Sequence, residues 1–70
     1  MREQLSRETH IRVVKSFQDT FGIDEDFPRL NKGDGSYDNM FYESLRNNKF
    51  SKAKATQAMD NWKANNGFDF

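Results

Sequence analysis

The chain contains no cysteine and only one histidine among its 70 residues. The lack of cysteine excludes disulfide bonds, zinc sites built on thiolates and a cysteine nucleophile. His10 cannot ligate a metal by itself, and we interpret it as a surface residue at the start of a helix. We therefore expect no metal site and no cofactor. Absence of cysteine also fits a reducing compartment, so we expect a cytoplasmic protein.

Apolar residues are scarce as well, because they make up 34% of the chain against about 45–50% in typical globular domains. No stretch approaches the roughly 20 apolar residues of a membrane span, and no apolar segment of a signal peptide follows the first charges. The ten aromatic residues offset part of this deficit, since each can bury about 150–250 Å². The composition predicts one small domain covering residues 1–70.

What the chain does contain is a helical pattern with local start and stop signals. Apolar residues recur at helical spacing in three segments. We expect helices from Arg7 or Glu8 to Phe21, from Tyr37 or Asp38 to Arg46 or Asn47, and from the N-cap Ser51 to a stop at Gly67. Gly22 ends the first helix and the two asparagines Asn47 and Asn48 end the second, because asparagine tolerates the left-handed conformation.

These signals predict an all-α domain of three helices. One long ordered loop connects helices one and two, and the apolar residues Ile23, Phe27 and Leu30 pin it to the core. Residues 1–6 are expected to fray, because Leu5 is their only apolar anchor. The in-phase positions expected to converge in the core are Phe17, Phe41, Leu45, Ala58 and Trp62.

Two acidic segments invite a metal-binding interpretation. The segment Lys32–Asp38 resembles part of an EF-hand loop, yet half of the required oxygen ligands are missing from it. A tight turn before the second helix explains it better. The adjacent carboxylates Asp24–Asp26 lack the geometry of paired catalytic acids and are interpreted as a solvated loop. No glycine-rich phosphate loop or nucleophile motif is present, so we expect no enzyme.

The strongest functional pattern lies between the second and third helices. Residues 43–66 hold five basic and two acidic side chains, although the net charge of the whole chain is zero. Basic residues gather around the start of the third helix, and two aromatic residues lie at the edges of the apolar faces. The candidate partner-binding residues are Tyr42, Arg46, Lys49, Phe50, Lys52 and Lys54.

This pattern supports two hypotheses. Exposed aromatic residues beside a methionine favour a protein-binding surface. A basic turn between two helices is compatible instead with a helix-turn-helix that contacts nucleic-acid phosphates. The neutral net charge favours the protein partner. The chain is therefore expected to be a non-enzymatic protein–protein interaction module, with nucleic-acid binding as the alternative and no membrane contact.

The order of these landmarks also resembles an uncharacterised bacterial domain family that commonly follows SAP-like domains. The resemblance covers about residues 9–62. Its landmarks here are Val13, Phe17, Gly22, Phe27, Phe41, Leu45, Arg46, Ala58 and Trp62. It implies the same helical fold in a bacterial or phage protein, and the SAP-like neighbour implies a nucleic-acid context. The family's Gly-Lys-Thr before the last helix is replaced here by Phe50, Ser51 and Lys52.

Overall fold

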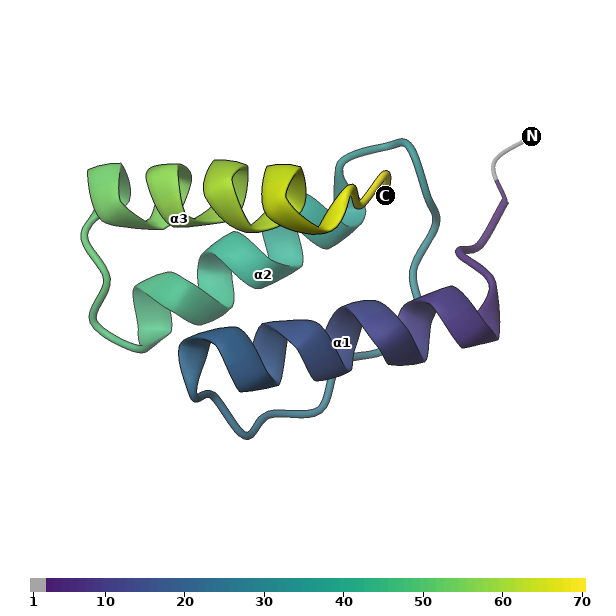
Figure 1. Cartoon of the computed structure of the whole chain (residues 1–70), viewed down its shortest axis with the longest axis horizontal. Coiled ribbons are helices and arrows are strands. Elements are labelled where there is room, and N and C mark those ends of the chain that lie inside the picture. The colour runs from purple at the N-terminus through teal and green to yellow at the C-terminus, as the bar shows by residue number, and fades with distance from the viewer. Residues whose placement is uncertain (1–2) are drawn as a thin grey trace.

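The structure is a computed structural model that describes residues 3–70, and it contains three helices (Figure 1). Helix α1 spans Arg7–Phe21, α2 spans Ser36–Asn47 and α3 spans Lys52–Asn66. A long loop joins α1 to α2, whereas a short turn joins α2 to α3, so that α2 and α3 form an antiparallel hairpin beside α1. The expected all-α fold with one long ordered loop is confirmed, and no strand is assigned within residues 3–70.

Local capping explains where the helices begin and end. The Oγ atoms of Ser6 and Ser51 accept hydrogen bonds from the backbone N–H groups of Thr9 and Lys54 at the starts of α1 and α3. Gly22 and Gly67 adopt the left-handed conformation, with φ of 66° and 63°, directly after α1 and α3. That conformation costs little without a Cβ atom, which is why these glycines end their helices.

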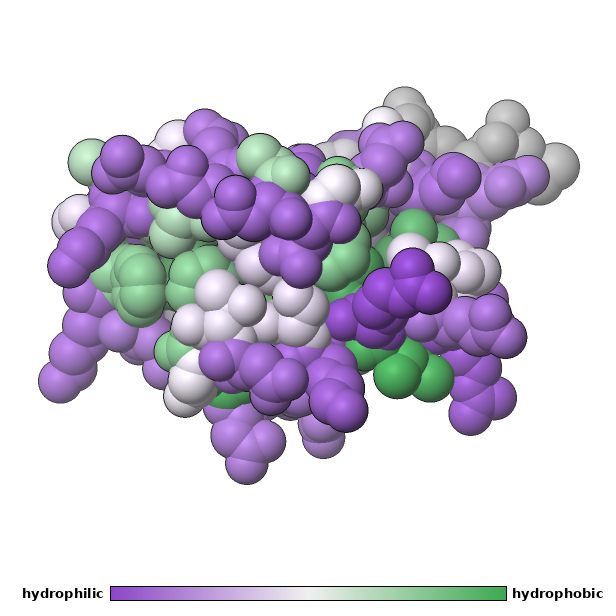
Figure 2. Space-filling view, viewed as in Figure 1, coloured by the Kyte–Doolittle hydropathy of each residue, from purple (hydrophilic) through white to green (hydrophobic). Residues whose placement is uncertain are grey.

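The core is built mainly of aromatic rings. Phe17, Phe41 and Trp62 meet at its centre, with ring centroids 4.5 Å apart for the Phe17–Phe41 pair and 5.2 Å apart for Phe41–Trp62. Figure 2 shows apolar and neutral side chains in a band between α1 and α3, with hydrophilic side chains on the outer sides of both helices. The buried apolar residues are Leu5, Val13, Phe17, Ile23, Tyr37, Phe41, Leu45, Ala55, Met59, Trp62 and Phe70.

The phase of two helices differs slightly from the expected one. On α3, Ala55 and Met59 are buried, while Ala58 is only partly buried at the edge of the core. On α1, Val13 is fully buried alongside Phe17, while Val14 is only partly buried against the core. Each of these helices packs against more than one neighbouring element. Its buried face is therefore wider than a single stripe of residues.

The N-terminal segment is held in place from Glu3 onwards, in contrast to the expected fraying. Leu5 is only 3% exposed, and its backbone N–H donates to the carbonyl oxygen of Leu30 over 2.9 Å. The Lys32 N–H donates to the Glu3 oxygen over 2.9 Å. Residues 1 and 2, which share that expectation, lie outside the described residues.

The C-terminal residues also belong to the core. Phe70 is 4% exposed, and its ring lies 5.7 Å from the rings of Phe41 and Trp62. The backbone oxygen of Phe70 accepts a hydrogen bond from the N–H of Gly33 over 3.0 Å. The last residues therefore close the core between α3 and the long loop.

Candidate functional site

The turn between α2 and α3 is a tightly bonded helix end. The Phe50 N–H donates to the Leu45 oxygen over 3.0 Å, and the Lys49 N–H donates to the Arg46 oxygen over 3.1 Å. This pair of bonds is the Schellman arrangement, which requires a left-handed residue after the helix. That residue is Lys49, with φ of 74°, and not one of the asparagines assigned to it from the sequence. Asn48 has φ of −96°.

Two of the candidate partner-binding residues contribute to this turn. The guanidinium of Arg46 donates to the Phe50 backbone oxygen over 2.9 Å. The Phe50 ring is partly buried and meets the Phe21 ring edge to face at 6.0 Å. Phe50 therefore holds the turn to α1, so that only part of its side chain is available to a partner, while Arg46 bonds within the turn and remains exposed.

Three lysines project from the same end of the molecule. Lys49 lies in the turn, and Lys52 and Lys54 lie in the first turn of α3; all three are exposed. No acidic residue lies in that first turn. Because the start of a helix carries a partial positive charge, lysines there lower helix stability by a few tenths of a kcal/mol each, about 0.3–1.

Tyr42 lies away from this basic end, in a groove between α2 and α3. The groove has a volume of about 380 Å³ and is lined on α2 by Asp38, Asn39 and Tyr42 and on α3 by Thr56, Met59, Asp60 and Lys63, with Gly35 at its edge. Tyr42 is half-buried, and Met59, which belongs to the core, also lines the groove. We call this hollow the α2–α3 groove.

An ion pair closes one end of the α2–α3 groove. The Nζ of Lys63 lies 2.9 Å from Oδ1 of Asp38 and 4.8 Å from the centre of the Phe70 ring. The pair is partly exposed, so it contributes at most a few tenths of a kcal/mol to stability, about 0.3–0.5. Its effect is geometric, because it fixes the Lys63 side chain across the two helices.

The structure thus separates the candidate residues into two surfaces. Lys49, Lys52 and Lys54 remain at the basic end, while Tyr42 joins groove residues that the sequence did not mark as functional. The missed residues are Thr56, Met59 and Asp60. A signal was present in the sequence, because Thr56 and Asp60 lie four residues apart and therefore share one face of α3.

In both acidic segments, a carboxylate accepts a hydrogen bond from the protein itself. Oδ1 of Asp34 accepts from the Ser36 N–H over 2.9 Å, which caps the approach to α2. Oε2 of Glu25 accepts from the Oγ of buried Ser44 over 2.8 Å. Across residues 3–70, no group of three His, Asp or Glu side chains is arranged to hold a metal ion.

No helix within the described chain is long and apolar enough to cross a membrane. Comparisons of the chain with protein-family models, with curated proteins and with solved structures find no match.

Proposed function

We propose that this domain is a non-enzymatic protein-binding module whose partner occupies the α2–α3 groove. The observation that carries the proposal is that half-buried Tyr42 from α2 and buried Met59 from α3 both line this groove. Tyrosine and methionine are enriched at the centres of protein interfaces, where flexible or amphipathic side chains adapt to a partner.

The charges at the rim indicate what the partner carries. Asp60 is exposed and makes no hydrogen bond or ion pair with residues 3–70, whereas Asp38 is already paired with Lys63. A partner with an apolar side chain for the floor and a basic residue for Asp60 would complement the groove.

The dimensions of the groove suit a short segment. The groove is lined on α3 from Thr56 to Lys63, which corresponds to a length of about 12 Å. A partner helix of about two turns covers that length, in the helix-in-groove mode of recognition. The proposed partner is therefore an amphipathic helical segment with a basic residue near its apolar anchor.

The proposal can be tested with peptides selected from a random library displayed on phage. We expect the selected peptides to shift the amide NMR signals of Tyr42, Thr56 and Asp60. Tyr42→Ala should weaken binding at least about tenfold, the effect of losing one interface anchor, without unfolding the domain. Glu43→Ala is the matched control, because Glu43 is exposed on α2 and does not line the groove. Peptides that bind Tyr42→Ala as tightly as the wild type would refute the proposal.

A second candidate, contact with nucleic-acid phosphates, is favoured by one specific observation. Lys49, Lys52 and Lys54 all occupy positions that disfavour lysine locally, through left-handed backbone in one case and the helix dipole in the others. Residues kept at a local cost often act in binding. A salt-dependence measurement, described in the Discussion, separates this candidate from the first.

A further inference from the structure

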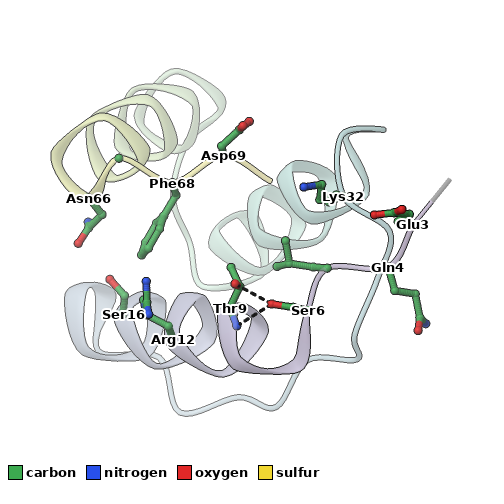
Figure 3. Close-up of a pocket in the computed structure, with 12 residues that line it drawn as sticks. Glu3, Gln4, Ser6, Thr9, Arg12, Ser16, Lys32, Asn66, Phe68 and Asp69 are labelled. Carbon is green, nitrogen blue, oxygen red and sulfur yellow. Dashed lines mark hydrogen bonds between the residues drawn. The ribbon is translucent and has the colours of Figure 1, made fainter.

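A second hollow lies between α1 and the chain that follows α3 (Figure 3), and it shares no lining residue with the α2–α3 groove. Its volume is about 580 Å³, which falls within the range of about 300–1,000 Å³ for small-molecule sites. Thr9, Arg12 and Ser16 line it from α1, Phe68 and Leu5 supply apolar surface, and Lys32 lines it from the long loop. We call it the α1 cavity.

The α1 wall of the cavity is a row of hydrogen-bond donors. Thr9, Arg12 and Ser16 follow one another at helical spacing, so they lie on one face of α1. Arg12 makes no hydrogen bond or ion pair with any of residues 3–70, and its side chain rises from α1 toward Phe68 in Figure 3. Its guanidinium is therefore available to an anion.

Both hydroxyl groups in this row have hydrogens to donate. Thr9 Oγ1 accepts a hydrogen bond from Ser6 Oγ over 2.8 Å. Ser16 Oγ accepts one from the indole Nε1–H of Trp62 over 3.0 Å. A hydroxyl that accepts one bond still holds its own hydrogen, and no acceptor for it is found among residues 3–70. Thr9 and Ser16 thus flank Arg12 with two uncommitted donors.

The cavity also provides an apolar wall. Phe68 is partly buried and its ring is fixed against Trp62, at 5.3 Å between centroids. Figure 3 shows this ring extending toward α1, above Arg12 and Ser16. An aromatic ring of a ligand can stack or pack edge to face on Phe68 while its acidic group reaches the donor row.

Two carboxylates also line the cavity, and their positions define where an anion can bind. Figure 3 places Glu3 near Lys32 and away from Arg12, and the Asp69 carboxylate points away from α1. The Arg12 end is therefore the positive end of the cavity. Ser6 already caps the start of α1, so the recognition group is the side-chain donor row and not the helix terminus.

We propose that the α1 cavity binds a small aromatic carboxylate, with Arg12 and Ser16, one helical turn apart, on the carboxylate and Phe68 against the ring. This site is separate from the α2–α3 groove and does not depend on the proposed protein partner. A ligand for this cavity must be a planar anion, because Arg12 can bind a carboxylate through two parallel hydrogen bonds. It must also carry an apolar body to contact Phe68.

Sodium benzoate is the probe for this proposal, and its binding is measured by titration with detection of the amide NMR signals. We expect saturable shifts of Thr9, Arg12, Ser16 and Phe68 at millimolar benzoate. Benzamide has nearly the same shape without the charge and should shift these signals much less. Inorganic phosphate carries charge without an apolar body and should also bind more weakly than benzoate.

Arg12→Gln should weaken benzoate binding at least about tenfold, as expected for loss of a charge-assisted hydrogen bond. Arg7→Gln is the matched control, because Arg7 is an exposed arginine on α1 that does not line the cavity. Arg12 has no partner within the described chain, so its replacement should leave the melting temperature unchanged. Equal binding of benzamide, phosphate as effective as benzoate, unaltered binding by Arg12→Gln, or shifts that do not saturate would each overturn the proposal.

Discussion

The hydroxyl of Tyr37 lies 2.7 Å from Nδ1 of His10, and the same oxygen accepts the backbone N–H of Leu30 over 2.9 Å. A phenolic oxygen can accept and donate at once, so it pairs with Leu30 and with the His10 ring together; which atom of the His10–Tyr37 pair donates depends on the tautomer of His10. One buried hydroxyl therefore connects α1, the long loop and α2. His10 is partly buried in this contact, so it is not the free surface residue expected from the sequence.

Tyr37→Phe tests the energetic value of this connection. The substitution leaves the Leu30 N–H and the His10 ring nitrogen without their partner, and we expect a loss of about 1–2 kcal/mol in the free energy of unfolding. For a domain of this size that loss lowers the melting temperature by about 4–8 °C per kcal/mol.

The matched control for Tyr37→Phe is Tyr42→Phe. The Tyr42 hydroxyl makes no hydrogen bond with residues 3–70, so its removal should leave the melting temperature within about a degree of wild type. Equal effects of the two substitutions in a thermal melt would show that the Tyr37 connection contributes nothing specific.

The sequence was sufficient for features that depend on neighbouring residues and insufficient for those that join distant ones. The ends of α1 and α3 were predictable because Ser51, Gly22 and Gly67 act within one helical turn. The link from His10 to Tyr37 spans 27 residues. No periodicity within either helix encodes such a contact, so it was missed.

The burial of the chain ends was missed for a similar reason. Leu5 and Phe70 are isolated apolar residues in polar segments, and such residues usually lie in mobile ends. Here each finds a backbone partner in the long loop, at Leu30 and Gly33 respectively. The α2–α3 groove likewise depends on how two helices pair, which the spacing on either helix alone does not specify.

Trp62→Ala should destabilise the domain severely. Trp62 is 3% exposed, and its ring contacts Phe17, Phe41 and Phe70. Truncation of a buried tryptophan costs about 3–5 kcal/mol, which can exceed the stability of a small domain. Ile11→Ala removes a large side chain that is 55% exposed and should change stability little. The free energies of unfolding of both variants are measured by urea titration. A Trp62→Ala protein as stable as Ile11→Ala would show that Trp62 is not part of the core.

Lys49→Gly should stabilise the protein. Lys49 adopts φ of 74°, and relief of the left-handed strain on its Cβ exceeds the added entropy of glycine in the unfolded chain. We expect a gain of about 0.5–1 kcal/mol. Lys54→Gly is the contrasting control, because glycine inside a helix costs about 1 kcal/mol. A fall in the melting temperature of Lys49→Gly would show that the lysine side chain itself stabilises the turn.

Calcium should leave the melting temperature unchanged. A ligand that binds the folded state must raise stability by mass action, and the Asp34 carboxylate already caps the Ser36 N–H. The measurement is a thermal melt with millimolar calcium and with a chelator, using magnesium as the ionic-strength control. A rise specific to calcium would reveal a site at Asp24–Asp26 or Asp34–Asp38.

The two candidate functions differ in their dependence on salt, and this difference decides between them. If Lys49, Lys52 and Lys54 each contact a phosphate of duplex DNA, the logarithm of the binding constant should fall with the logarithm of salt concentration with a slope of about −2.7. Simultaneous replacement of the three lysines by glutamine would remove the binding and the slope together, while Arg7→Gln and Lys15→Gln on α1 would not.

A peptide anchored by Tyr42 in the α2–α3 groove should instead bind with little salt dependence, because the energy comes from burial of apolar surface. We expect the triple lysine variant to retain peptide binding and the wild type to bind DNA only weakly at physiological salt. Tight DNA binding that requires the three lysines would reverse the order of the two candidates.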